Sequence, residues 1–278
     1  MKKFYVIVCL ILAVSCAYLG KSREEWIKNA QNETLYVKID GVDNAAHKKL
    51  VFIQHGLASN MEHQAVQAAK KAFLDSNYTV VTFDDRYSLG KSGNEVEFVS
   101  LESFEKDLET VISWAKKQSF YSEPFALVGH SLGGASVLQY GADHPKQVSL
   151  LVPITPVISG ELWEKSCMTN MEEFCKAWQQ HGSFEYIDQK NQKKAIIPYK
   201  VVTESKSFNA YTLAPKITAK TLVIAGEKDI VIGTDEVKNL TTKLSKNSKA
   251  VVISGSGHNF ENRQNQADLY KAIKGFIR

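Results

Sequence analysis

Two kinds of hydrophobic periodicity alternate along most of this chain. Short apolar or alternating runs predict strands, whereas apolar residues at steps of three and four predict amphipathic helices. The predicted strands cover residues 34–40, 50–53, 78–83, 125–128, 148–152, 222–225 and 250–253. Helical spacing follows at residues 65–73, 101–115, 135–140, 237–244 and 269–277. Such alternation predicts an α/β fold, with a mostly parallel sheet that is covered by helices on both faces.

One long segment, residues 154–213, interrupts this alternation. Aromatic and sulfur-containing residues gather there, and five share one helical stripe: Trp163, Cys167, Met171, Phe174 and Trp178. Such a stripe usually packs against a domain core. The segment, however, follows the strand at 148–152 and so leaves the carboxyl edge of the sheet, where ligands of α/β proteins bind. We predict that residues 154–213 form a small cap over this edge.

Residues 1–20 have the pattern of a secretory signal peptide. Two lysines precede an apolar run over residues 4–14, and small residues follow that run. The run is too short to span a bilayer, which takes about 20 residues. The mature protein would then consist of a polar tether or short helix at 21–32 and one domain over residues 34–278.

Two outcomes of processing fit the end of this leader. Ala13-Val14-Ser15 before Cys16 resembles a bacterial lipobox, although alanine stands where leucine is usual. A lipidated Cys16 would be the first residue and would attach the protein to a membrane. Cleavage after a small-x-small pattern, without lipid, is the alternative. Either route predicts an exported protein that is periplasmic, secreted or membrane-anchored.

Cys167 and Cys175 would remain after export, and an oxidising compartment permits a disulfide between them. Eight residues along one straight helix rise about 12 Å, which is beyond disulfide reach. A bridge therefore requires a turn between them, for example at Thr169-Asn170. The sequence has no cysteine or histidine spacing typical of metal sites, so we expect no metal. A formal net charge of +4 gives no reason to expect a nucleic-acid partner.

Candidate chemistry begins at residues 129–133, Gly-His-Ser-Leu-Gly. An apolar strand precedes this Gly-x-Ser-x-Gly sequence and a helical pattern follows it, which is the context of a nucleophile elbow. A serine at so sharp a turn has strained backbone angles, and glycines leave room where a Cβ would clash. An ordinary glycine-bearing turn before a helix is the alternative. We predict that Ser131 is a nucleophile.

A serine hydroxyl is a weak nucleophile that needs a general base and an acid to orient that base. His258 lies in a glycine-flanked loop directly after the strand at 250–253, and Asp229 lies in the loop after 222–225. We predict a catalytic triad of Ser131, Asp229 and His258. Glu227 is the alternative to Asp229, because it lies in the same loop.

The reaction also needs backbone N–H donors where the oxyanion develops. Leu132, directly after the nucleophile, is predicted to supply one. Leu57 is predicted to supply the other, because it follows the strand at 50–53 and Gly56 allows a close backbone approach. His130 occupies a variable position of the elbow and needs no chemical role. Further histidines are predicted to lie at the surface: His47, His63, His144 and His181.

Together these motifs resemble the α/β-hydrolase superfamily. The matching segments are His55-Gly56, residues 83–86 with Gly90-Lys91-Ser92-Gly93, residues 129–134, the Asp229 loop and Gly257-His258. The resemblance covers the chain from about residue 35 onward, apart from the cap, and is greatest to esterases, monoacylglycerol lipases and serine aminopeptidases. It implies cleavage of an ester or amide through an acyl-enzyme, without a cofactor.

One segment departs from the family pattern Asp-x-Arg-Gly-x-Gly-x-Ser. Glycine directly follows the arginine in that pattern, whereas Tyr87-Ser88-Leu89 separates Arg86 from Gly90 here. The longer loop would lie at the rim of the pocket, so the shape of the substrate is not carried over from the family. Asp84 and Arg86 are predicted to be structural and to fix this loop.

We therefore expect a serine hydrolase that cleaves a small-molecule carboxylic ester, since an alkoxide leaving group demands least of the site. A serine aminopeptidase or amidase is the alternative enzyme. It would need a carboxylate in the cap to hold a free amine, and the candidates are Glu161, Glu164, Glu172, Glu173 and Glu185. An inactive exported binding protein is the alternative from another class, because the fold does not determine activity.

Overall fold

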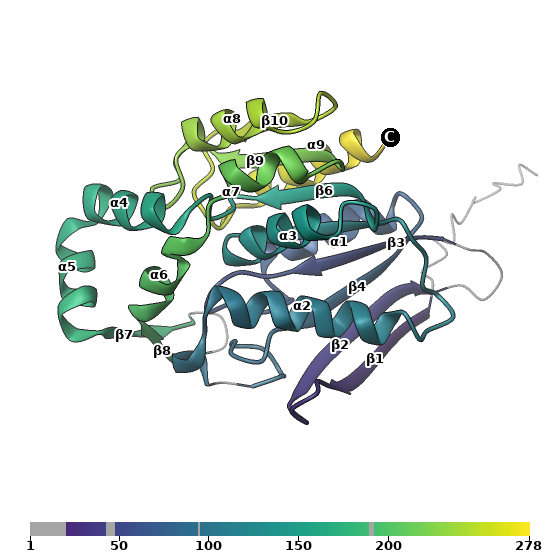
Figure 1. The fold of residues 1–278 in the computed structure, drawn as a ribbon, viewed down its shortest axis with the longest axis horizontal. Helices are drawn as coiled ribbons and strands as arrows, with labels where there is room; N and C mark the ends of the chain where they lie inside the picture. The colour runs from purple at the N-terminus through teal and green to yellow at the C-terminus, as the bar shows by residue number, and fades with distance from the viewer. Residues whose placement is uncertain (1–20, 43–47, 94, 189–191) are drawn as a thin grey trace, which may run out of the picture.

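The computed structural model describes residues 21–42, 48–93, 95–188 and 192–278 (Figure 1). The predicted leader and its Cys16 lie outside these residues, as does His47. Within them, a central eight-stranded sheet has the order β1-β2-β4-β3-β5-β6-β9-β10. Its strands are β1 (Lys21–Lys28), β2 (Thr34–Val42), β3 (Lys49–Gln54), β4 (Tyr78–Asp84), β5 (Phe125–His130), β6 (Val148–Ile154), β9 (Lys220–Gly226) and β10 (Lys249–Ile253).

The sheet is mostly parallel, which confirms the predicted fold class. From β4 to β10 each pair of neighbouring strands is parallel. The pairs β1–β2 and β2–β4 are antiparallel. Each residue of β4 and β5 is buried, as expected for strands that are covered on both faces.

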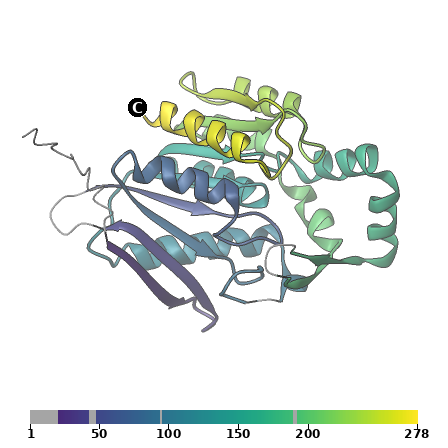
Figure 2. The ribbon, with the colours of Figure 1, turned by 180° about the vertical axis from the view of Figure 1, so that it is seen from behind.

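Helices cover both faces of the sheet. They are α1 (Gln64–Leu74), α2 (Leu101–Ala115), α3 (Leu132–Asp143), α8 (Thr234–Lys243) and α9 (Arg263–Ile277). Helices α1 and α9 pack side by side on one face (Figure 2), over strand residues such as Val51 and Ile53. Helices α2, α3 and α8 share a second core with residues such as Phe52 and Leu127. Alternate residues of β3 thus enter opposite cores, as the pleat requires.

The prediction of a tether or short helix over residues 21–32 is wrong, because residues 21–28 form strand β1. This strand pairs with β2 along its length. Ile27 is buried, and the ring of Trp26 packs on that of Tyr36 with centroids 5.1 Å apart. Residues 21–28 thus form a strand because they pair with β2, although they contain no apolar run. Its charged residues suit the edge of a sheet.

The cap lies between β6 and β9. Its elements are helices α4 (Gly160–Asn170), α5 (Glu172–His181), α6 (Lys200–Glu204) and α7 (Ala210–Leu213), the hairpin of β7 (Ser183–Ile187) and β8 (Lys194–Pro198), and the short 3₁₀ helices η2 (Ser205–Ser207) and η3 (Ala214–Lys216). A further 3₁₀ helix, η1 (Val96–Phe98), precedes α2. In Figure 1 the cap projects from one end of the sheet. The hairpin was not among the predicted strands.

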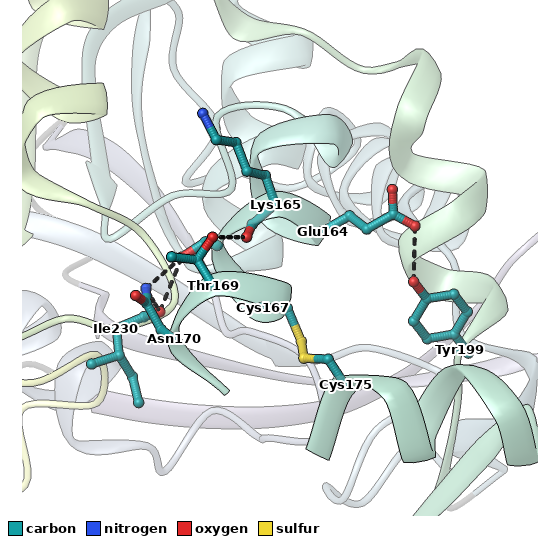
Figure 3. The surroundings of a disulfide bond; sticks show 9 residues. Glu164, Lys165, Cys167, Thr169, Asn170, Cys175, Tyr199 and Ile230 are labelled. Atoms are coloured by element: carbon teal, nitrogen blue, oxygen red, sulfur yellow. Dashed lines mark hydrogen bonds between the residues drawn. A yellow bond between two sulfur atoms is a disulfide. The ribbon is translucent and has the colours of Figure 1, made fainter. Parts of the chain in front are cut away.

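The prediction of a single helical stripe in the cap is wrong, because the helix is interrupted between α4 and α5. Met171 joins the two helices with φ −141° and ψ 46°. This break allows a disulfide between Cys167 and Cys175, whose Cα atoms are 5.9 Å apart (Figure 3). The turn that the bridge requires thus lies at Met171, directly after the predicted Thr169-Asn170. Closing so short a loop contributes about 2.5 kcal/mol to stability in the chain-entropy account.

Helix α2 carries a half-buried carboxyl that should make stability depend on pH. Burial, with Asp143, Glu109 and Glu102 nearby, raises the pKa of Glu105 to about 7. The folded protein therefore binds this proton more tightly than the unfolded chain does, and stability decreases as pH rises from about 4.5 to about 7. We expect Glu105→Gln to raise the free energy of unfolding at pH 8 by about 1–2 kcal/mol, after allowance for solvent screening. At pH 4 the variant should match the wild type. Urea unfolding at both pH values measures this difference, and an equal effect at the two values would contradict the assignment.

Candidate active site

Ser131 lies at the sharp turn between β5 and α3. Its backbone has φ 54° and ψ −114°, a strained conformation for a residue with a side chain. The turn depends on its glycines. A Cβ at Gly129 would lie 2.1 Å from the carbonyl oxygen of Gly133, and a Cβ at Gly133 would lie 2.1 Å from that of His55. The predicted strand–turn–helix context is thus present around Ser131.

The structure brings the three predicted triad residues together. The Nε2 atom of His258 lies 2.9 Å from Oγ of Ser131, and its Nδ1 atom lies 2.8 Å from Oδ2 of Asp229. The Asp229 side chain is fully buried. Its Oδ1 atom accepts hydrogen bonds from the amides of Val231 at 2.8 Å and Ile232 at 3.0 Å. The carboxylate is therefore held in place, with Oδ2 directed at the imidazole.

Glu227, the alternative acid, does not reach His258. Its Oε2 atom accepts hydrogen bonds from Oγ of Ser254 at 2.9 Å and from the amide of Gly255 at 2.7 Å. The side chain thus braces the loop that follows β10. The geometry favours Asp229 as the residue that orients the imidazole.

The two predicted oxyanion donors, Leu57 and Leu132, both line the cavity that contains Ser131. Leu132 is the first residue of α3, so the helix itself provides no acceptor for its amide. Gly56 packs directly on Ser131, because a Cβ at residue 56 would lie 2.9 Å from Cβ of Ser131. Leu57, the next residue, lines the same cavity as Leu132 and Ser131. The residues predicted to supply the two N–H groups, one at the start of α3 and one in the loop after β3, therefore both line the cavity at Ser131.

A cavity of about 890 Å³ opens above Ser131 and His258. Loops that follow β3, β4, β5, β9 and β10 form its floor, at the carboxyl edge of the sheet. The cap supplies an apolar wall, and its lining residues include Trp163, Cys167, Met171, Phe174, Trp178 and Phe184. Trp178 and Phe184 pack edge to face with centroids 5.1 Å apart. The residues of the predicted stripe thus pack on one another and also line the cavity.

Two histidines next to the site have contacts that the sequence analysis did not foresee. His63, predicted at the surface, is half-buried and lines the cavity. Its ring stacks on that of His130 with centroids 4.6 Å apart. The Nε2 atom of His130 lies 3.1 Å from the carbonyl oxygen of His258, where an N–H can donate to it. Burial holds the pKa of His130 well below its usual value, so the ring is neutral. The histidine stack therefore supports the backbone of the His258 loop.

Asp84 and Arg86 have structural contacts, as predicted. Asp84 accepts hydrogen bonds from the amides of Met61 at 2.8 Å and Lys91 at 2.7 Å, and thus joins two loops at the rim of the cavity. Arg86 donates to Asp107 at 2.5 Å and also contacts Glu33. Both residues hold the longer loop between Arg86 and Gly90 in place.

Some features are absent from the described residues. Within residues 21–42, 48–93, 95–188 and 192–278, no three His, Cys, Asp or Glu side chains are grouped so that they could hold a metal ion. In the same ranges no helix has the length and apolar character needed to cross a membrane.

A comparison with family models decides the identity. The model described as serine aminopeptidase, S33, matches residues 45–264, which is most of the chain. The chain belongs to this family of α/β hydrolases. Members of the S33 serine aminopeptidase-like family are hydrolases, and solved esterases are among the structures most similar to this chain. No curated protein sequence matches it significantly.

Solved structures similar to this S33-family chain share its fold at low sequence identity. Est1E from Butyrivibrio proteoclasticus, solved with ferulic acid bound, superposes with a TM-score of 0.72 at 20% identity, over 91% of this chain and 97% of that chain. Alpha/beta hydrolase domain-containing protein 10 from mouse has a TM-score of 0.69 at 17% identity, over 92% and 98%. The esterase Pf2001 from Pyrococcus furiosus has a TM-score of 0.67 at 19% identity, over 93% and 90%.

Proposed function

We propose that this chain is an exported serine hydrolase that cleaves carboxylic esters through an acyl-enzyme. One observation carries the proposal. A continuous chain of hydrogen bonds runs from Asp229 through His258 to Ser131, and it ends at the floor of a large apolar cavity. A buried carboxylate, an imidazole and a serine at these distances form the arrangement that activates a hydroxyl.

The first half of the reaction forms the acyl-enzyme. Asp229 accepts the Nδ1–H bond of His258, which leaves the lone pair of Nε2 facing Ser131. As Oγ of Ser131 attacks the ester carbonyl, Nε2 takes the hydroxyl proton. The amides of Leu57 and Leu132 would stabilise the negative charge that develops on the carbonyl oxygen. His258 then returns the proton to the leaving alkoxide, the C–O bond breaks, and the acyl group remains on Oγ.

Water completes the cycle by the same route. His258 takes a proton from the water that attacks the acyl-enzyme carbonyl, and the same two amides stabilise the second oxyanion. Collapse of this intermediate breaks the bond to Oγ, and His258 returns the proton to Ser131. The products are a carboxylic acid and the alcohol released earlier.

The lining of the cavity favours a bulky apolar acyl group. A volume of about 890 Å³ is near the upper end for small-molecule sites. Its cap wall carries indole, phenyl and thioether side chains. Binding of an alkyl or aromatic group against such a wall is favourable, because it removes apolar surface of both partners from water. An ester of a medium-chain or aromatic acid suits such a wall better than an acetate.

The five cap glutamates that were predicted to hold a free amine do not support an aminopeptidase reaction. None of the five cap glutamates, all within the described residues, lines the cavity. Three of them are paired with lysines: Glu164 with Lys206, Glu172 with Lys176 and Glu185 with Lys194. The acidic residues that line the cavity are instead Glu62, Asp84, Glu261 and the cap residue Asp188. The matching family model is nevertheless described as a serine aminopeptidase, so the two activities should be measured side by side.

Export is supported by the disulfide of the cap, because such bonds persist in oxidising compartments. The leader at residues 1–20, with the choice between lipidation of Cys16 and simple cleavage, lies outside the described residues. Metabolic labelling with a fatty-acid probe, compared between the wild type and Cys16→Ser, distinguishes the two routes.

To test the proposed activity, the full chain and its Ser131→Ala variant are both expressed in a host that exports and processes them. Both proteins are assayed on p-nitrophenyl esters of increasing chain length, on an aromatic acyl ester and on aminoacyl nitroanilides. Labelling by a fluorophosphonate is mapped by mass spectrometry. We expect ester turnover with an optimum beyond acetate, a label on Ser131, and loss of both in the variant. A folded wild type without turnover or label would reject the proposal and favour the binding-protein alternative. A preference for nitroanilides would reject the ester assignment.

A further inference from the structure

The imidazole of His55 is fully buried behind the loop that carries Gly56 and Leu57. Its Nδ1 atom lies 2.8 Å from the carbonyl oxygen of Gly56. Its Nε2 atom accepts a hydrogen bond from the amide of Asp85 at 3.0 Å. In a neutral imidazole one nitrogen donates and the other accepts. Since Nε2 accepts, Nδ1 carries the hydrogen and donates it to the Gly56 carbonyl.

This hydrogen bond determines where the Leu57 amide points. The carbonyl of Gly56 and the N–H of Leu57 belong to one planar trans peptide, so they point in opposite directions. With the carbonyl held against His55, the N–H is directed away from the imidazole. Gly56 packs on Ser131 and Leu57 lines the cavity, so the free side of this peptide is the side of the active site.

Without such a hydrogen bond the peptide has a second orientation. Rotation of the Gly56–Leu57 peptide changes ψ of Gly56 and φ of Leu57, and a residue without a Cβ leaves the first of these angles less restricted. A rotated peptide would direct the carbonyl of Gly56 at the developing oxyanion. That arrangement replaces an attractive contact with repulsion between two oxygens. The bond from His55 selects the productive orientation.

Asp85 holds the imidazole from its other side. Its Oδ2 atom lies 3.1 Å from Nε2 of His55, and its Oδ1 atom accepts a hydrogen bond from Gln54 at 2.7 Å. As an ionised oxygen, Oδ2 would be buried without a hydrogen-bond donor. Burial, with Asp107 nearby, raises the pKa of Asp85 well above its usual value, and burial lowers the pKa of His55. The pair is therefore neutral, and the carboxyl O–H shares the Nε2 lone pair with the Asp85 amide.

We propose that His55 and Asp85 are positioning residues, which orient the Gly56–Leu57 peptide so that the Leu57 amide faces the oxyanion. This inference rests on the proposed function and adds two buried residues, neither of which lines the cavity. Asp85 occupies the variable position of the Asp-x-Arg motif. The family motif leaves this position open, and the carboxyl that this chain places there contacts His55, which directly precedes Gly56 and Leu57.

Two amide substitutions at residue 55 separate positioning from packing. The amide nitrogen of asparagine can reach the place of Nδ1, whereas that of glutamine reaches the place of Nε2. We expect His55→Gln to lower kcat for ester hydrolysis by about 10²-fold, the size of a lost oxyanion donor, with KM within about twofold. His55→Asn should retain kcat within about fivefold. The affinity for a trifluoromethyl ketone, whose adduct carries an oxyanion, should fall in His55→Gln in proportion to kcat.

A second pair tests Asp85 and covers the case in which a residue 55 variant does not fold. Asp85→Asn keeps a neutral N–H donor beside Nε2, whereas Asp85→Leu removes the donor at nearly the same volume. In the leucine variant only the backbone amide of residue 85 still donates to Nε2, so we expect it to lose part of kcat and of ketone affinity together, and the asparagine variant to recover most of both.

The outcomes distinguish this inference from the proposed function. An equal decrease of kcat in both variants of a pair, or a higher KM at unchanged kcat, would show that the residues only pack. Either result would overturn the inference while the ester activity stands. A wild type that neither hydrolyses esters nor reacts at Ser131 would overturn both. Selective loss in the glutamine and leucine variants would support the inference.

Discussion

Replacing Asp229 by asparagine should lower kcat for ester hydrolysis by about 10⁴-fold. The carboxylate now accepts the Nδ1–H bond of His258 at 2.8 Å and so keeps the lone pair of Nε2 toward Ser131. A carboxamide can present its N–H₂ group instead, which favours the tautomer with hydrogen on Nε2. That tautomer cannot take the proton from the serine hydroxyl. The backbone amides of Val231 and Ile232, which bond to Oδ1, still hold the side chain, so the effect should be on chemistry rather than on folding.

Glu227→Gln is the matched control for this prediction. The residue belongs to the same loop, but its side chain bonds to Ser254 and Gly255. A glutamine oxygen can accept the same hydrogen bonds, so we expect kcat to remain within about threefold. Steady-state kinetics on one ester, with circular dichroism to verify folding, provides the comparison. Similar losses in the two variants would mean that the imidazole is oriented by the loop as a whole.

Replacing Gly133 by alanine should lower the free energy of unfolding by about 2–4 kcal/mol and abolish activity. The added Cβ would lie 2.1 Å from the backbone carbonyl oxygen of His55. Neither α3 nor the loop after β3, which carries His55, can move away without disturbing the other, because the contact is with backbone rather than with a flexible side chain. Urea unfolding gives the stability, and the same sample gives the activity.

Gly275→Ala provides the opposite expectation for the same chemical change. Gly275 lies exposed on α9, and its added Cβ would meet no atom within 4 Å. Alanine favours the helix and restricts the unfolded chain, so this variant should be more stable by about 0.5–1 kcal/mol. If Gly133→Ala and Gly275→Ala changed the free energy of unfolding in the same direction, the turn at Ser131 would not depend on the close approach at Gly133.

The sheet could be predicted from sequence because burial on both faces produces apolar runs that local composition reveals. Strand β1 could not, since its residues 21–28 are mostly charged and become a strand only through pairing with β2. The hairpin strands β7 and β8 lack the apolar run that marks the buried strands of the sheet, because β7 has no buried residue and β8 is only partly buried. The break at Met171 has no glycine or proline to mark it.

For the candidate site, spacing indicated which loops meet but not how deep each side chain lies. Ser131 and His258 stand beside glycines directly after strands, and this position identifies them. Asp229 and Glu227 share one loop, and only the course of the backbone separates the residue that reaches the imidazole from the one that does not. The contact of His55 with Asp85 joins residues from the ends of two neighbouring strands, so no local sequence pattern could predict it. The place of His63 in the cavity wall likewise depends on a contact with a residue distant in sequence, His130.

The bridge between Cys167 and Cys175 has a practical consequence for any preparation of this protein. Polypeptide made in a reducing cytosol and polypeptide matured in an oxidising compartment are chemically different molecules, although their sequences agree. They differ in the cavity wall itself, because Cys167 lines it. A substrate profile measured on one preparation therefore does not describe the other. Thiol alkylation followed by mass spectrometry should accompany each batch, so that a specificity is always assigned to a defined covalent form.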